Sequence, residues 1–247
     1  TEMNMKFSPV TIMSDFEPAL TEVLSNEFPN CNHVGCYFHF TQAVYRHIQS
    51  LGLSNEYNSN EDVQIICRKI MVLPFLPLSL VLQAFDDLYE SLLQAPPQKI
   101  DLLKPLFQYF ENQWIKKVDL KQWNVYGLEI RTNNNVEGFH HFSVLRYFIQ
   151  SYTFLGFHNR LNSRLSKSHP NIWTFIKCIQ GEENGFNHLM FQMKAGLSTR
   201  PKTAKTQAIQ QRLDTLYSLY NNSEIGAMEL FDGLSYVVAK NISSKKK

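Results

Sequence analysis

Short apolar runs and longer helical stripes follow one another along the chain, and their order indicates how it folds. Residues 9–13 are apolar and β-branched, which is typical of a buried strand. Residues 33–38 and 125–130 indicate two further extended segments. Between residues 61 and 117, apolar positions recur at helical spacing and prolines separate the stripes. This block is therefore predicted to be helical throughout.

Amphipathic helices are predicted after each of the first two strands. Ser14 or Asp15 can cap the first helix, which carries Pro18 in its first turn and ends near Pro29. The second helix ends at Gly52.

The C-terminal half is also predicted to be largely helical. A helix begins after the asparagines at 133–135, another covers 152–168, and a third runs from 170 to 196 with several breaks. Residues 197–206 are polar and basic, which indicates a linker. Two stripes then predict a hairpin packed on the core or on a partner: Ile209, Leu213, Leu216 and Tyr220, followed by Leu230, Leu234 and Val237.

The order of elements indicates an α/β protein that is mostly helical by content. The helical block lies between two strand-containing pieces, so it is interpreted as an insertion. The predicted organisation is a core at 7–52, an all-helical insertion at 53–120, a return to the core with following helices at 121–196, and a helical hairpin with a basic tail at 197–247. A length of 247 residues suits one large domain with such an insertion.

Composition narrows the classes of function. The net charge of +2 implies no general attraction to phosphate, so any nucleic-acid surface must be local. The four cysteines have no regular spacing, which favours a reducing compartment. Neither a signal peptide nor a membrane-spanning apolar run is present in the sequence, so no membrane partner is predicted.

Asp15 directly follows the first predicted strand. Open α/β sheets bind ligands at the carboxyl ends of their strands, so this carboxylate is a candidate metal ligand. The competing interpretation is a helix cap, which accepts a backbone N–H of the helix that follows. The local pattern leaves both open.

Glu137 lies in a similar place, after the predicted extended segment at 125–130 and three asparagines. Asn134 and Glu137 have the spacing of a capping box, in which the glutamate bonds back to the cap amide. The same placement would present the Glu137 carboxylate at the end of a strand. Local pattern favours the cap, and the role of a metal ligand stays open.

Cys36 and His39 form a C-x-x-H pair beside His33. Structural zinc sites use four ligands, commonly two close pairs, and the sequence offers no convincing second pair. A buried cysteine and histidine that hold the loop near the site are the favoured interpretation. Later in the chain, Arg146, Arg160, Arg164 and Lys167 are interpreted either as a solvated face or as a patch that contacts DNA phosphates. His140 and His141 could contact substrate phosphate, but a surface or core histidine is the favoured interpretation for each.

Asp15 and Glu137 together would suit a divalent cation. Mg²⁺ and Mn²⁺ prefer oxygen ligands, and two-metal phosphoryl transfer uses carboxylates to hold both ions. A third carboxylate is normally needed, and no suitable strand of this sequence supplies one. The two carboxyl groups are expected to lie within roughly 4–8 Å of each other, which would bracket two ions about 4 Å apart.

Three segments in this order resemble the Mutator-like (MULE) transposase domain, which in animals often accompanies FLYWCH-type zinc fingers. They are IMSDFEPAL, FPNCNHVGCYFHFTQAVYRHIQ and, after the helical block, RTNNNVEGFHHF. The resemblance covers residues 9–168 and implies an RNase H-like fold with a DDE triad. By that resemblance Asp15 is the second acidic residue, Glu137 the third, and Cys36 with His39 the family's C-x-x-H motif.

The family's first aspartate belongs to a strand that would precede residue 1. The chain is therefore expected to be a fragment with an incomplete RNase H-like core, unable to cleave DNA alone. In the complete protein the resemblance implies DNA hydrolysis at transposon ends and strand transfer to target DNA, with Mg²⁺ or Mn²⁺, in the nucleus. A homo-oligomer stays open.

Two alternatives belong to other classes of protein. The first is a domesticated transposase remnant that binds DNA or protein without catalysis. The second is a helical scaffold with no nucleic-acid role, which fits the low net charge but leaves the spaced motifs unexplained.

Overall fold

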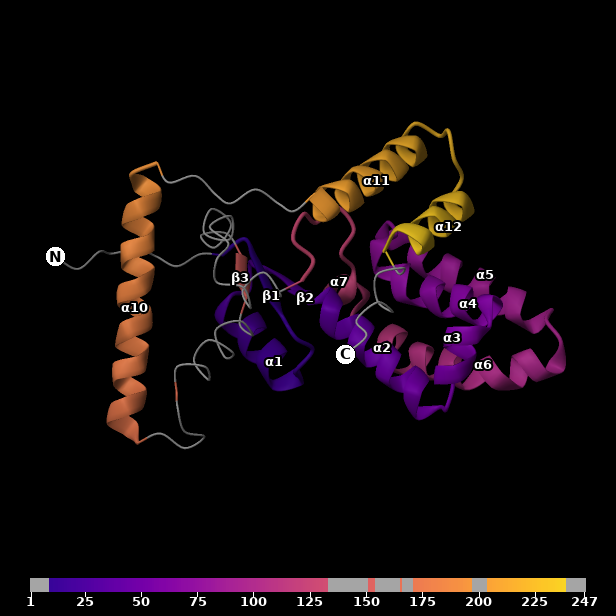
Figure 1. The fold of residues 1–247 in the computed structure, drawn as a ribbon, viewed down its shortest axis with the longest axis horizontal. Coiled ribbons are helices and arrows are strands. Elements are labelled where there is room, and N and C mark those ends of the chain that lie inside the picture. Colours follow the sequence, from indigo (N-terminus) through magenta and orange to yellow (C-terminus); the bar gives the residue numbers. More distant parts are fainter. Residues whose placement is uncertain (1–8, 133–150, 154–164, 166–170, 197–203, 239–247) are drawn as a thin grey trace. The chain divides into compact units, whose positions relative to one another are not determined.

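A computed structural model of the chain describes residues 9–132, 151–153, 165, 171–196 and 204–238. The chain divides into two compact units (Figure 1). One unit comprises residues 1–36 and 132–201, and the other comprises residues 37–131 and 202–247. The described part is mostly helical with a small parallel sheet, which confirms a mostly helical α/β chain. None of the helices within the described ranges has the length and apolarity to cross a membrane.

The first unit contains a three-stranded parallel sheet in the order β2-β1-β3. The central strand β1 spans Thr11–Ser14, and it is flanked by β2 (Asn32–Gly35) and β3 (Ser151–Thr153). Thr11 pairs with Asn32 on one side and with Ser151 on the other. Helix α1 (Pro18–Glu27) connects β1 to β2. The first predicted strand and helix are therefore confirmed, and the second strand is shorter than predicted.

Helix α10 (Ile172–Lys194) also falls within the range of the first unit. The sequence predicts a helix with several breaks here, and this is wrong because α10 runs without interruption. Gly181 and Gly185 lie inside it. A glycine lowers helix stability by about 1 kcal/mol relative to alanine, which does not force a helix of this length to end.

The second unit is built from helices. Most of residues 61–117 are helical, as predicted. The elements in chain order are α2 (Tyr37–Ser50), α3 (Ser54–Ser59), α4 (Glu61–Val72), the short 3₁₀ turns η1 (Leu73–Phe75) and η2 (Leu78–Leu80), α5 (Val81–Leu93), α6 (Pro97–Phe110), the π-helical turn η3 (Glu111–Ile115) and α7 (Leu120–Trp123).

Aromatic rings form the centre of this unit. Phe40 on α2 is 0% exposed, and its ring stacks on Trp123 with centroids 5.5 Å apart. The edges of Trp114 and Phe110 meet the same ring at 4.7 and 6.0 Å. Aromatic pairs of this kind add to the stability that area burial already provides.

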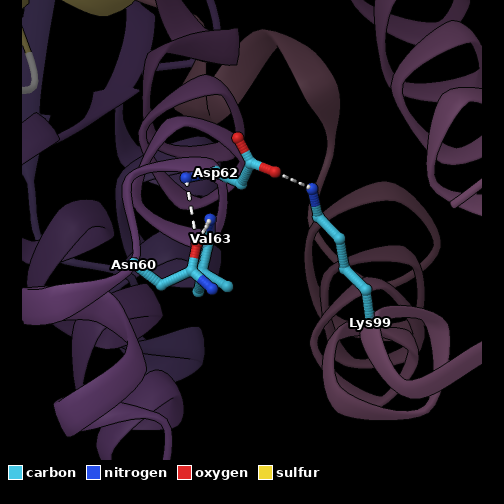
Figure 2. Close-up of polar contacts among 4 residues, drawn as sticks. All are labelled: Asn60, Asp62, Val63 and Lys99. Atoms are coloured by element: carbon cyan, nitrogen blue, oxygen red, sulfur yellow. Dashed lines mark hydrogen bonds and ion pairs between the residues drawn. The ribbon is translucent and has the colours of Figure 1, made fainter. Parts of the chain in front are cut away.

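Helix α4 begins with a side-chain cap that Figure 2 shows in detail. The Asn60 carboxamide oxygen accepts hydrogen bonds from the backbone N–H groups of Asp62 and Val63 at 3.1 and 3.3 Å. The cap satisfies two of the four amide donors that a helix start leaves without partners. Asp62 also pairs with Lys99 of α6 at 2.8 Å (Figure 2).

The C-terminal helices belong to the second unit. Helix α11 (Ala204–Asn221) and helix α12 (Ala227–Val238) form the predicted hairpin, and α12 packs against α4 (Figure 1). The Lys69 ammonium lies 2.6 Å from an Asp232 carboxylate oxygen, and the Tyr217 hydroxyl donates to the Phe75 carbonyl at 2.9 Å. The hairpin is therefore packed on the helical block of its own chain.

The predicted extended segment at 125–130 is wrong. Residues 120–123 form α7, and the following residues turn instead of pairing with a strand. The Val125 N–H donates to the Pro74 carbonyl at 2.8 Å, and Gly127 has a φ of 72°. The Val125 N–H, which a sheet would need as a donor, is used by the Pro74 carbonyl about fifty residues earlier. A local apolar pattern cannot reveal such a distant partner.

The predicted helix at 152–168 is wrong at its start, because Ser151–Thr153 form β3. Leu165 is in no regular element, and the remaining residues of that prediction lie outside the described ranges. The boundaries of the compact units also differ from those of the predicted pieces. Helix α2 belongs by compactness with the helical unit, although the predicted core piece extends to residue 52.

Candidate functional site at the end of the central strand

Asp15 directly follows the last residue of β1, at the carboxyl end of the central strand. The ladder with the next strand reaches this point, since the Cys36 N–H donates to the Ser14 carbonyl at 2.7 Å. The Asp15 side chain is half-buried. Its backbone position is therefore set by the sheet, at the edge at which parallel sheets bind ligands.

The helix-cap interpretation of Asp15 is wrong. The N-cap of α1 is Glu17, which has extended dihedral angles of −70° and 117° and makes no side-chain cap bond. Asp15 lies two residues earlier, and its Oδ1 accepts from the Glu17 N–H at 3.4 Å. That separation is longer than the usual 2.9–3.0 Å of such a bond. Among the described residues this is the only hydrogen bond that the carboxylate accepts, so most of its acceptor capacity is available to a cation.

Ser14 is fully buried, and its hydroxyl has two polar neighbours. The Oγ lies 2.8 Å from the Asp15 carbonyl oxygen and 2.7 Å from His33 Nε2 on β2. Burial lowers the pKa of His33, and the negative charge of Asp15 opposes that shift. Because Ser14 is 0% exposed, its hydroxyl is inaccessible to a substrate and is not a candidate nucleophile.

Gly35, the last residue of β2, leaves space for the ring of Phe16. A Cβ atom at position 35 would lie 2.2 Å from two atoms of that ring, which is far inside contact distance. Phe16 is the residue after Asp15. The close packing of its ring on Gly35 therefore fixes the chain immediately after Asp15.

The C-x-x-H residues are separated by the boundary of the two units. Cys36 is buried at the end of the first unit's N-terminal segment, and His39 is half-buried in the first turn of α2. The edge of the His39 ring meets the Phe38 ring with centroids 5.4 Å apart. Within the part of the chain that the structure describes, no group of three or more His, Cys, Asp or Glu side chains could hold a metal ion.

The other predicted site residues lie outside the described residues. They are Glu137, His140, His141, Arg146, Arg160, Arg164 and Lys167. The predicted approach of Glu137 to Asp15, the capping box at Asn134 and the basic patch therefore stay predictions.

Two interactions near the motifs are not predictable from the local sequence pattern. Ser14 pairs with Gly35 in the sheet, and His33 is two residues before Gly35 on the same face, so the two side chains are diagonal neighbours. Strand register, once proposed, would have revealed that contact.

Arg131, the first residue of the RTNNN segment, donates to Gln210 of α11 at 3.0 Å and lies over the Phe75 ring at 5.3 Å. No local signal marks that pairing, because α11 begins more than seventy residues later.

The arrangement presents one carboxylate, held by backbone at the end of a central strand and little used by the protein itself. Such a group suits a hard cation, which takes oxygen ligands.

A family-model scan of the chain gave no match, and neither a search of curated proteins nor one of solved structures found a significant relative.

Proposed function

We propose that the chain supplies the second and third carboxylates of a Mutator-like DDE transposase site, with Asp15 and Glu137 as ligands of Mg²⁺ or Mn²⁺. The proposal rests on the resemblance of the three sequence segments. It takes support from one structural observation, the placement of Asp15 after the central strand of a parallel sheet with its carboxylate not used as a helix cap.

The chemistry that this role requires is compatible with the residues present. Two bound divalent ions would activate the attacking oxygen and stabilise the leaving oxygen of a DNA phosphodiester. The Asp15 side chain offers oxygen ligands at a half-buried position, where a cation keeps part of its water shell. The chain's own contribution is to hold this carboxylate in place before any metal arrives.

Localised oxidative cleavage tests the role of Asp15. Fe²⁺ replaces Mg²⁺ in oxygen-ligand sites, and with ascorbate and peroxide it cleaves the backbone beside its ligands. Two carboxylates hold a divalent ion more weakly than the usual three, so Fe²⁺ is added at saturating concentration. Under that condition we expect fragments that end near Asp15 and near Glu137 in the 247-residue chain, with excess Mg²⁺ suppressing both. Asp15→Asn should abolish both cuts, because the two side chains share the ions.

Asp86→Asn is the matched control, since Asp86 is an exposed aspartate on α5 in the other unit. This variant should keep the wild-type fragments. Cleavage that is absent from the wild-type chain, or that persists unchanged in Asp15→Asn, would contradict the proposal.

A non-catalytic binding module is the second candidate, and α10 is the observation that favours it. Trp173 and Ile172 at its start are 72% and 63% exposed, and Phe191 near its end is 69% exposed. Ile172, Trp173, Phe175 and Ile176 are all exposed within the first turns of this helix, and a contiguous exposed apolar patch marks an interaction site. Binding to DNA that weakens steeply with salt in both wild type and Asp15→Asn, without iron cleavage in either, would favour this candidate.

A further inference from the structure

The chain passes between its two compact units at three places, after residues 36, 131 and 201. Each unit is therefore built from two pieces of chain, and the pieces alternate along the sequence. Residues 132–201, the second piece of the first unit, leave the helical unit at residue 131 and return to it at residue 202. Contacts within the helical unit thus decide whether the two ends of this piece are held together.

Arg131 joins the first two of these crossings through its backbone. Its carbonyl oxygen accepts from the Tyr37 N–H at 2.8 Å, so the first and last residues of the piece at 37–131 are hydrogen-bonded to each other. Tyr37 is anchored at its other end as well, because its hydroxyl donates to the Met71 carbonyl at 3.1 Å. The chain therefore enters and leaves the helical unit at one fixed point.

The side chain of Arg131 extends to the third crossing. Its Nη1 donates to the Gln210 carboxamide oxygen at 3.0 Å, and the Gln210 amide donates in turn to Asp214 at 2.6 Å. Gln210 lies within the first two turns of α11, the helix with which the chain returns to this unit. The Arg131 guanidinium also lies over the Phe75 ring, 5.3 Å from its centroid, which adds a cation–π contact.

Helix α11 is itself packed where it meets Arg131. Tyr217 comes seven residues after Gln210, so the two side chains lie on the same face of the helix. The Tyr217 hydroxyl donates at 2.9 Å to the carbonyl of Phe75, the residue whose ring lies beneath Arg131. Leu213 lies between them and is 1% exposed. The contact between Arg131 and Gln210 is therefore part of a packed surface of the helical unit.

We propose that Arg131 and Gln210 form a clasp, which holds together the two ends of residues 132–201 and so couples the stability of the first unit to that of the helical unit. While the helical unit is folded, the clasp reduces the conformational freedom of this long segment before it packs. The entropy that the first unit loses on folding is then smaller. The first unit needs this segment, because it contains β3, which pairs with β1. The coupling does not require a metal at Asp15.

Hydrogen exchange of the metal-free 247-residue chain tests the clasp. Gln210→Leu removes the acceptor of Arg131 and keeps a side chain of similar size. We expect the amides of β1 to exchange about 2–12-fold faster in this variant, the contribution of one hydrogen bond, although the substitution lies in the other unit. Gln211→Leu is the matched control, since Gln211 is the next residue of α11 and is exposed. This control should leave β1 at the wild-type rate.

Two further measurements make the test independent of a single variant. The double variant with Arg131→Met and Gln210→Leu should exchange no faster at β1 than Arg131→Met alone, because the acceptor has already lost its donor. In wild type at low urea concentrations, the amides of β1 and α11 should lose protection in one common step. Separate steps in wild type would overturn the clasp even if a variant failed to fold. Faster exchange confined to the helical unit in Gln210→Leu, or additive effects in the double variant, would also overturn it.

Discussion

Replacement of Gly35 by alanine should disturb the sheet edge that carries Asp15. The added Cβ would lie 2.2 Å from Cε1 and Cζ of the Phe16 ring and 3.0 Å from Cδ1. Real Cβ contacts do not approach so closely, so the ring must leave its place. Phe16 follows Asp15 in the chain, and the displacement would therefore reach the candidate ligand.

The expected magnitude follows from the cost of overpacking. An inserted methyl that forces a side chain from its place typically costs about 1–3 kcal/mol. The obstacle is the far end of a side chain rather than backbone, so the ring can rotate away and we expect the lower half of that range. For a protein of this size each kcal/mol lowers the midpoint of thermal unfolding by about 2–4 °C.

A double-mutant cycle identifies the cause. Phe16→Ala removes the ring, so Gly35→Ala should cost less in that background, with a coupling energy of about 0.5–3 kcal/mol. Hydrogen exchange of peptides that cover β1 and β2 reports the stability of this unit. Gly226→Ala is the control, because a Cβ there would meet only a Glu229 oxygen at an ordinary 3.7 Å. Equal effects of Gly35→Ala with and without the Phe16 ring would refute the steric explanation.

Two further predictions concern the helical unit. Phe40→Ala should cost about 3–5 kcal/mol in urea unfolding, because a fully buried ring with aromatic neighbours leaves a cavity, whereas Tyr236→Ala at a 60% exposed position should change stability by less than about 0.5 kcal/mol. Burial raises the pKa of the Cys67 thiol from 9.0 to about 12, so between those values the unfolded chain releases a proton that the folded chain retains, and stability falls as pH rises. Cys67→Ala should remove that contribution, at most about 1.4 kcal/mol per pH unit, from urea unfolding measured between pH 8 and 10; parallel pH profiles for the two proteins would contradict it.

The local sequence pattern predicts an element correctly where the residues of that element alone decide its structure. The apolar run before Ser14 predicts β1, and helical stripes predict α1 and the block from α4 to α6. In each case the face that needs burial is encoded within a few turns of chain. The hairpin of α11 and α12 was also readable, but its place against α4 depends on distant contacts such as Lys69 with Asp232.

Pattern failed where a distant group decides the outcome. The apolar residues at 125–130 look extended, yet the Pro74 carbonyl takes the Val125 donor and Gly127 turns the chain. Similarly, the pairing of Arg131 with Gln210 joins segments far apart in sequence. Neither partner is marked in the local sequence, so periodicity alone could not have found these contacts.

The cap of α1 is a different case, because the deciding signal was local. Pro18 occupies the first turn of α1, and a proline disfavours helical dihedral angles in the residue before it. Glu17 is therefore extended and becomes the N-cap, which places Asp15 two residues outside the helix. A cap at Asp15 would have placed Glu17 in the first turn of the helix, with the helical dihedral angles that the following proline disfavours. The proline thus separates the carboxylate from the helix that would otherwise occupy it, and the strand end that precedes Asp15 determines where the carboxylate lies.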